Sequence, residues 1–123
     1  MCSSDLIAPT CIELAGGAPG PHIQGRSLVP LLSGVAQDWR TSFLIEYYSE
    51  SAMPWLIGMT YKAVRTARHK LIHWVQHDDC DELYDLEQDP YELQNRIGDL
   101  AYQEVRDGLH HELARLVAAS VGL

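Results

Sequence analysis

The sequence predicts a small α+β domain in which short helices precede an antiparallel sheet of about four strands, and a longer helix packs on that sheet. Short runs rich in aromatic and β-branched residues recur between residues 42 and 86, as is typical of strands. An apolar stripe with helical spacing follows over residues 99–119. Because the strands are consecutive and do not alternate with helices, the order of elements favours α+β over a parallel α/β sheet.

Size and charge limit the possible functions. The chain has 123 residues, enough for one domain with a modest core. Nine lysines and arginines against 17 aspartates and glutamates give a net charge of −8. This balance argues against nonspecific binding to nucleic acid or to an anionic membrane, because both need a basic face. No apolar run approaches the roughly 20 residues of a membrane span, and three widely spaced cysteines predict no disulfide framework.

The N-terminal segment divides into a suspected leader and a linker region. Met1–Leu6 corresponds to the translation of a common sequencing-adapter tail after a start codon, so we expect residues 1–6 to be non-native. A natural polar N-terminus is the alternative. Residues 7–41 are expected to form linker helices, one over Ile7–Ala15 and a second that begins at Ser27, each ended by a glycine.

The sheet and the long helix are expected in residues 42–123, as a C-terminal subdomain. Only Ala67-Arg68 separates the two middle β-type runs, which predicts a hairpin. The expected strands are Ser42–Tyr48, Tyr61–Thr66, His69–Val75 and Leu83–Leu86. The helix is expected over Asp99–Ala119, because Asp99 can accept the first free N–H groups. Its apolar stripe consists of Tyr102, Val105, Leu109, Leu113, Leu116 and Val117.

The segment Asp81–Ile97 connects the last strand to the helix and contains a sharp stop at Asp89-Pro90. Proline removes a ladder donor and keeps the preceding residue extended, so the strand has to end there. We expect Asp89 to cap a following helical turn, with Pro90 at its first position and Glu92 completing a capping box. From physics alone, this segment is a structural clasp with solvated carboxylates.

Histidine and cysteine side chains are the first candidates for chemistry. His69, His73 and His77 are four residues apart, but four residues of strand span roughly 13 Å. Three such side chains cannot reach one zinc ion at about 2 Å each, so half-exposed strand histidines are expected. Cys11 is expected to be buried in the first helix, and the carboxylates around Cys80 disfavour its thiolate.

The loop after the first strand is the best candidate for a binding surface. Tyr47, Tyr48 and Trp55 offer flat aromatic faces that suit sugar rings, with Ser49 and Glu50 as polar partners. Packing of these rings under the neighbouring loop is the alternative. The candidate substrate-binding residues are these three aromatic residues, and no catalytic or metal-binding residue is assigned.

Several motifs resemble, in family order, the C-terminal part of the sulfatase family. Residues 7–16 are similar to the family's Ile-Ala-Pro-Thr and Leu-Ala-Gly, and residues 24–32 to its Gln-Gly-Arg-Ser-Leu-x-Pro-Leu-Leu. Residues 61–72 resemble Tyr-Lys-Ala-Val-Arg-Thr-x-Arg-x-Lys-x-Ile, and residues 82–95 resemble the signature that begins Glu-Leu-Tyr-Asp-Leu and contains Asp-Pro. The family's aspartate before Ile-Ala-Pro-Thr would fall at Leu6, where the suspected leader ends.

The resemblance implies a larger protein of the alkaline-phosphatase-like superfamily. Such proteins have an α/β catalytic domain followed by a smaller domain with a four-stranded antiparallel sheet and a packed helix. Family chemistry uses a formylglycine, made from the first residue of Cys/Ser-x-Pro-x-Arg, and a calcium or magnesium ion. No cysteine or serine of this chain begins that motif. The resemblance therefore implies these cofactors for the full-length parent only, and the chain alone is expected to be inactive.

Three functions stay open. In the first, the parent is a sulfatase that hydrolyses sulfate esters, and the run Ile-Glu-Tyr-Tyr resembles enzymes that act on sulfated sugars. This chain would then complete the fold and border the substrate cleft, with the N-terminal catalytic domain as its partner. In the second, the chain is a stand-alone binding or interaction module. In the third, it belongs to a related phosphonate or phosphate ester hydrolase. A periplasmic or secreted location is compatible with such a parent.

Overall fold

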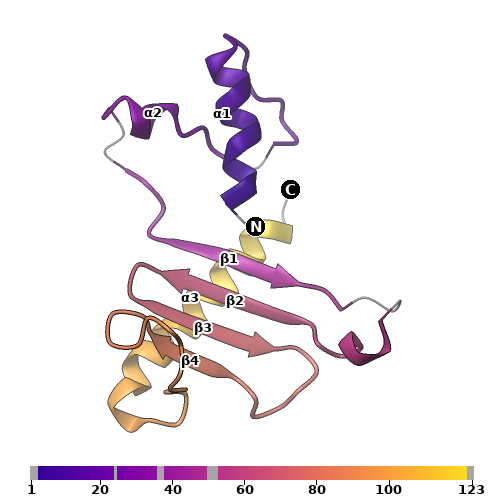
Figure 1. The fold of residues 1–123 in the computed structure, drawn as a ribbon, viewed down its shortest axis with the longest axis vertical. Coiled ribbons are helices and arrows are strands. Elements are labelled where there is room, and N and C mark those ends of the chain that lie inside the picture. The colour runs from indigo at the N-terminus through magenta and orange to yellow at the C-terminus, as the bar shows by residue number, and fades with distance from the viewer. Residues whose placement is uncertain (1–2, 24, 36–37, 50–52, 122–123) are drawn as a thin grey trace. The chain divides into compact units, whose positions relative to one another are not determined.

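The computed structural model describes residues 3–23, 25–35, 38–49 and 53–121. The chain forms two compact units, Met1–Arg40 (unit 1) and Thr41–Leu123 (unit 2), which are drawn in Figure 1. Unit 1 contains short helices, and unit 2 contains a four-stranded antiparallel sheet with one long helix. The predicted α+β class is therefore confirmed. In the described part of the chain, no helix is long and apolar enough to cross a membrane.

Unit 1 begins with a 3₁₀ turn, η1 (Ser3–Leu6), that continues directly into the helix α1 (Ile7–Leu14). Its second helix, α2 (Val29–Leu32), is a single turn. Both predicted helices are present, although the second begins at Val29 and not at Ser27. The chain leaves each helix through a glycine with a positive φ, 79° at Gly16 and 71° at Gly34, a conformation that a side chain would disfavour.

Thr10 joins the two helices of unit 1. Its buried hydroxyl donates to the carbonyl oxygen of Leu6 at 2.5 Å and accepts the N–H of Leu28 at 2.8 Å. The packed face of η1 and α1 therefore contains Leu6, Pro9 and Thr10, all of them buried. Cys11 lies outside this face and is exposed, so the expectation that it is buried is wrong.

Asp5 belongs to the packing of unit 1 although it lies in the suspected leader. Its carbonyl oxygen contacts Gly25 so closely that a Cβ at Gly25 would stand 1.7 Å away. Its carboxylate pairs with Nη1 of Arg40 at 3.2 Å. Gly25 is therefore needed for this close approach, and the turn η1 is continuous with the packed helix.

Unit 2 is built on a sheet whose strands follow one another in the order β1-β2-β3-β4, each antiparallel to the next. The strands are β1 (Ser42–Tyr47), β2 (Tyr61–Thr66), β3 (His69–Trp74) and β4 (Glu82–Asp85). All four lie where the sequence predicts them, and β2 and β3 form the predicted hairpin. The connection between β1 and β2 contains a 3₁₀ turn, η2 (Pro54–Leu56).

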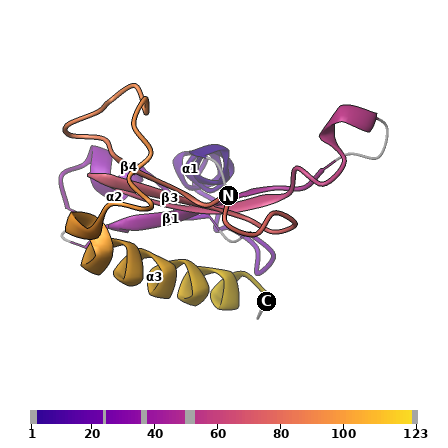
Figure 2. The same ribbon diagram turned by 90° about the horizontal axis from the view of Figure 1, so that it is seen from below.

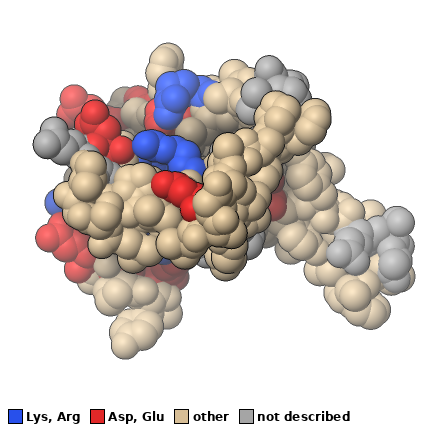
Figure 3. Space-filling model, turned by 90° about the horizontal axis from the view of Figure 1, so that it is seen from above, with Lys and Arg blue, Asp and Glu red and all other residues tan. Residues whose placement is uncertain are grey.

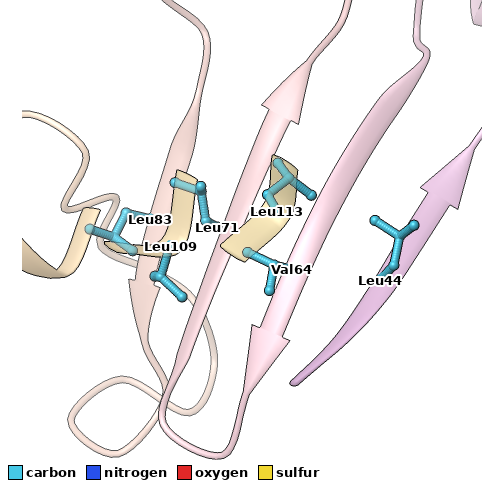
Figure 4. Packing of buried hydrophobic residues seen from close by; sticks show 6 residues of the cluster. All are labelled: Leu44, Val64, Leu71, Leu83, Leu109 and Leu113. Atoms are coloured by element: carbon cyan, nitrogen blue, oxygen red, sulfur yellow. The ribbon is translucent and has the colours of Figure 1, made fainter. Parts of the chain in front are cut away.

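The helix α3 (Gln103–Val121) crosses one face of the sheet (Figure 2). It follows a 3₁₀ turn, η3 (Leu100–Tyr102), where the predicted cap is confirmed because Asp99 Oδ1 accepts the N–H of Ala101 at 3.0 Å. The core between sheet and helix, shown in Figure 4, consists of Leu44, Val64, Leu71, Leu83, Leu109 and Leu113. Truncation of such a buried leucine costs about 2–5 kcal/mol, so this core is what holds α3 on the sheet.

The predicted helical turn at Pro90 is wrong. Only a hydrogen-bonded turn forms there, and Glu92 takes a positive φ of 56°. The carboxylate of Glu92 reaches Nζ of Lys70 on β3 at 2.6 Å instead of returning to the backbone of Asp89. Asp89 in turn accepts the N–H of Gln94 at 2.8 Å. The ion pair to the sheet replaces the local capping box because the loop has to turn back along β4.

Candidate functional site

The clasp (Asp81–Ile97) is organised around Asp85, the last residue of β4. Asp85 is 1% exposed and accepts hydrogen bonds from Nε and Nη2 of Arg68, the shortest at 2.8 Å. The hydroxyl of Tyr102 donates to the same carboxylate at 3.0 Å. The backbone N–H groups of Glu87 and Gln88 approach it at 3.2 and 3.4 Å. One carboxylate therefore joins the β2–β3 turn, β4 and the start of the helical segment.

The electrostatics of this cluster fix its protonation states. The Arg68 guanidinium holds the pKa of Asp85 well below its usual range, although burial alone would raise it. Burial, and next the hydrogen bond to Asp85, raise the pKa of the Tyr102 hydroxyl. His69 Nε2 lies 3.8 Å from the same carboxylate, and burial lowers the pKa of His69. Asp85 thus stays ionised and Tyr102 stays protonated at neutral pH, which suits a structural cluster.

Asn95 covers the outer edge of β4. Its Oδ1 accepts the N–H groups of Leu83 and Ile97, each at 3.0 Å, and its Nδ2 donates to the carbonyl oxygen of Asp81 at 3.2 Å. The N–H of Arg96 donates to the carbonyl oxygen of Leu83 at 2.7 Å. A strand edge left open would present free N–H and C=O groups to other chains. The clasp satisfies this part of the edge without adding a strand.

An aromatic row crosses the sheet on the face opposite α3. The register pairs Tyr47 with Tyr61 and Tyr61 with Trp74. The rings of Tyr47 and Tyr61 stack with centroids 5.6 Å apart, and Tyr61 meets Trp74 edge-on at 5.2 Å. Glu82 accepts hydrogen bonds from Trp74 Nε1 at 2.9 Å and from the Tyr84 hydroxyl at 2.5 Å. Burial and this contact raise the pKa of Tyr84 to about 12. The ring of Tyr47 therefore forms the β1 end of the row, where it is stacked on Tyr61.

The other two candidate residues differ from Tyr47 in being exposed. Tyr48 is 63% exposed and Trp55 is 76% exposed. Between them, the base of the β1–β2 hairpin is closed by Thr60, whose Oγ1 accepts the N–H of Ser49 at 3.2 Å and donates to its Oγ at 3.3 Å. Ser49, expected as a polar partner of the rings, thus bonds within the hairpin. Glu50, the second expected partner, lies outside the described residues.

A cleft that sequence reasoning missed lies between the β3–β4 connection and α3. It has a volume of about 520 Å³, and His73, Asp81, Arg106 and His110 are among its lining residues. Asp81 lies 3.0 Å from Nδ1 of His73 and 3.9 Å from Nε2 of His110. The sequence does not reveal that Asp81 lies near His110, because His110 is on α3 and is distant from Asp81 along the chain. Across the described ranges, no group of three or more His, Cys, Asp and Glu side chains could hold a metal ion.

Several basic side chains of unit 2 are paired with acidic neighbours. Figure 3 shows basic side chains that adjoin acidic ones on the face it presents. Nζ of Lys62 lies 3.3 Å from Glu46 on the neighbouring strand β1, and Nζ of Lys70 lies 2.6 Å from Glu92 in the clasp. The lysines of β2 and β3 are therefore neutralised by neighbours in the same unit.

The fold and the clasp together define a class of protein. A four-stranded antiparallel sheet with one packed helix, preceded by short helices, is the architecture expected for the C-terminal part of a sulfatase of the alkaline-phosphatase-like superfamily. The sequence matches the family described as "N-sulphoglucosamine sulphohydrolase, C-terminal" over residues 2–119, and the chain belongs to this family.

Curated relatives agree with this assignment. The chain is 35% identical over 98 residues to an N-acetylglucosamine-6-O-sulfatase of Bacteroides thetaiotaomicron, which covers 77% of this chain and 17% of that protein. It is 33% identical over 102 residues to a Δ4,5-hexuronate-2-O-sulfatase of the same organism, covering 82% of this chain and 20% of the relative. The chain thus spans about a fifth of the length of the curated relatives it matches.

Solved structures share the fold of this chain. One is a protein bound to its substrate D-glucosamine-2-N,6-O-disulfate, with a TM-score of 0.79 and 32% identity over 89% of this chain and 22% of that chain. Another is the phosphonate monoester hydrolase of Agrobacterium radiobacter, with a TM-score of 0.77 and 30% identity over 93% of this chain and 24% of that chain. Both likenesses extend over most of the present chain.

Proposed function

We propose that the chain is the C-terminal subdomain of a sulfatase whose whole protein hydrolyses sulfate esters of sugars. The observation that carries this proposal is the match to two relatives named as sulfatases of sugar substrates, over about four-fifths of the chain. A solved relative in complex with a sulfated glucosamine supports the same substrate class. The partner of the chain is then the catalytic domain of its parent.

The role of the chain in that enzyme is structural and positional. None of its cysteines or serines begins the Cys/Ser-x-Pro-x-Arg motif from which formylglycine is made. The described side chains also offer no set that fits the calcium or magnesium ion of the family. Both groups would therefore belong to the rest of the parent. The chain completes the fold and borders the substrate cleft with Tyr48 and Trp55, while Tyr47 supports the base of the hairpin, and it is inactive alone.

A second candidate function is phosphonate or phosphate ester hydrolysis by the parent. The structure of the Agrobacterium radiobacter phosphonate monoester hydrolase favours it, since its TM-score of 0.77 is close to the 0.79 of the sulfated-glucosamine complex. The Multifunctional alkaline phosphatase superfamily protein PehA of Trinickia caryophylli, 30% identical over 112 residues, points in the same direction. A stand-alone binding module is the remaining alternative.

An exchange protein tests the proposal. Residues 7–123 of this chain replace the matching C-terminal region of the Bacteroides N-acetylglucosamine-6-O-sulfatase, and sulfate release from N-acetylglucosamine 6-sulfate is measured. We expect a folded and active exchange protein, whereas deletion of the region without replacement abolishes activity. A folded exchange protein that releases no sulfate would contradict the proposal. A parallel exchange into the phosphonate monoester hydrolase that recovers a larger share of its activity would favour the second candidate function.

A further inference from the structure

We infer that Trp55, at the tip of the β1–β2 hairpin, stacks on a sugar ring of the substrate next to the ring that carries the reacting sulfate ester. The inference rests on the proposed function, from which the substrate class is taken, and assigns one side chain to one subsite. Trp55 is 76% exposed, whereas Trp74 lies in the aromatic row with its indole N–H bonded to Glu82. The two tryptophans of unit 2 thus have different environments.

The tip that carries Trp55 is held by its own backbone. Pro54 stands at the start of η2, where its fixed φ favours the turn. The N–H of Leu56 donates to the carbonyl oxygen of Met53 at 2.9 Å, and the N–H of Met59 donates to that of Leu56 at 3.1 Å. Gly58 takes a positive φ of 84° and lets the chain turn back. A turn whose backbone is held in this way needs little ordering on binding, so more of the contact energy appears as affinity.

The base of the hairpin is equally well anchored. Tyr47 and Tyr61 stack across it, and the Ser49–Thr60 hydrogen bonds close it. The carbonyl oxygen of Thr60 also accepts the N–H of Val75 at 3.0 Å, which continues the β2–β3 pairing beyond the strand ends. Figures 1 and 2 show η2 beyond the ends of β1 and β2. The described part of the hairpin therefore extends the sheet and carries an exposed indole on the turn η2.

The size of the tip favours a sugar over a protein as its occupant. The exposed apolar side chains beside Trp55 are Met53 at 41% and Ile57 at 63%. A specific protein interface buries about 800 Å² on each partner, more than the described side chains of this turn present. A pyranose ring, in contrast, has one apolar face of C–H groups that fits the face of a single indole. The flanking Met53 and Ile57 side chains exclude water from the edges of that contact.

The chemistry of the tip also indicates which ring it contacts. Residues 53–59 include no lysine, arginine or histidine. Apart from the indole N–H of Trp55, the side chains of residues 53–59 offer a sulfate group no cation and no hydrogen-bond donor in return for its lost hydration, which costs free energy. The apolar tip is thus suited to the uncharged face of a neighbouring ring. The inference predicts that oligosaccharides bind better than the corresponding monosaccharide.

Calorimetric titration of the 123-residue chain tests this assignment, with a heparin-derived tetrasaccharide and glucosamine 6-sulfate as probes at 0.15 M salt. We expect tighter binding of the tetrasaccharide, and we expect Trp55→Ala to weaken it about 3- to 10-fold, the range for one aromatic stacking contact. The affinity of Trp55→Phe for the tetrasaccharide should lie between those of the wild-type chain and Trp55→Ala. Tyr91→Ala is the matched control, because Tyr91 is an aromatic residue that is 81% exposed in the clasp, and it should leave binding unchanged.

The possible outcomes separate this inference from the proposed function. Equal tetrasaccharide affinity for the wild-type chain and Trp55→Ala would overturn the inference, as would an equal loss in Tyr91→Ala or no binding by the wild-type chain. None of these results bears on whether the exchange protein releases sulfate. An inactive exchange protein, conversely, would reject the proposed function while the titration still decides the role of Trp55.

Discussion

Arg68 and Asp85 form a two-point ion pair, with Nε of the guanidinium 3.2 Å from Oδ1 and Nη2 2.8 Å from Oδ2. The carboxylate is 1% exposed, whereas the arginine side chain is 48% exposed. The pair links the β2–β3 turn to the last residue of β4, and Tyr102 brings the helical segment to the same point. The aspartate of the Tyr-Asp-Leu motif therefore has a structural role, because it joins these three segments.

Substitution Asp85→Ala should destabilise unit 2 strongly. The change leaves the Tyr102 hydroxyl and two backbone N–H groups without their acceptor, so we expect a loss of about 2–4 kcal/mol in the free energy of unfolding. Urea denaturation followed by circular dichroism measures it. Glu87→Gln is the control, because Glu87 pairs with Arg68 at 3.2 Å but is 69% exposed, and it should cost less than about 1 kcal/mol. Equal losses would contradict the central position of Asp85.

Substitution Asn95→Ala should weaken the outer edge of β4. The N–H of Leu83 then loses its acceptor in a residue that is fully buried, which costs about 1–3 kcal/mol. Hydrogen exchange of the Leu83 amide measures the local effect, and we expect faster exchange. Asn95→Asp keeps an acceptor oxygen at this position and should protect that amide better than alanine does. Slower or unchanged exchange in the alanine variant would be the contrary result.

The stability of unit 2 should fall as the solution becomes acidic. Hydrogen bonds from Arg115 and Ser42 lower the pKa of Glu112 to about 2 from 4.5. A carboxylate with a depressed folded pKa contributes stability above its unfolded pKa, and that stability is lost as the pH falls through the folded pKa. Asp85 acts in the same direction. His69 also loses stability on acidification, and its contribution begins to fall at a higher pH than those of the carboxylates. Burial lowers the pKa of His69 from 6.5, so protonation of its side chain opposes folding.

Glu112→Gln isolates one part of this pH dependence. The free energy of unfolding, measured by urea titration from pH 5 to pH 2, should decline less steeply in the variant than in the wild-type chain. Glu104→Gln on the same helix is the control, since Glu104 is an exposed glutamate in the first turn of α3. An identical slope for wild type and Glu112→Gln would show that the contacts of Glu112 with Arg115 and Ser42 do not persist in solution.

Substitution Gly25→Ala should disrupt unit 1. Its Cβ would stand 1.7 Å from the carbonyl oxygen of Asp5, so the backbone has to shift, with a cost of about 1–3 kcal/mol. Limited proteolysis should cut the region around residues 20–35 faster in the variant. Gly20→Ala is the control, because a Cβ at Gly20 would meet no atom within 4 Å. Equal cleavage of both variants would mean that Asp5 and Gly25 are not in contact.

The isolated chain should self-associate, because the proposed function leaves surface uncovered that the parent would bury. Three large apolar side chains are at least four-fifths exposed: Tyr91 at 81%, Leu93 at 80% and Leu100 at 84%. Large apolar side chains exposed in this way favour association. Sedimentation velocity over a concentration series should show mass that increases with concentration. A monodisperse monomer that unfolds cooperatively would count against this expectation.

The sequence predicts the elements of this fold better than it predicts the contacts between them. The four strands and the stripe of α3 follow from periodicity, and glycines and Asp99 mark the helix ends. The turn at Pro90 is predicted wrongly because the competing partner of Glu92 is Lys70, 22 residues away. The burial of Cys11 is also predicted wrongly, because its helix packs through Pro9 and Thr10 and leaves Cys11 exposed. Local rules contain no information about such long-range partners.

In the candidate site, too, the sequence predicts which residues matter better than it predicts their contacts. Aromatic composition singles out Tyr47, Tyr48 and Trp55, but only the strand register shows that Tyr47 stacks on Tyr61 while the other two stay exposed. Likewise, the cleft at His110 requires α3 to lie across the ends of β3 and β4, which spacing alone does not reveal.

The most direct measurement is sulfate release from N-acetylglucosamine 6-sulfate, determined side by side for the 123-residue chain and for the exchange protein. The account predicts no release by the chain alone and steady release by the exchange protein, because the chain supplies structure and a substrate contact while the reacting groups come from the catalytic domain. Release of sulfate by the chain alone, or a folded exchange protein without activity, would contradict it.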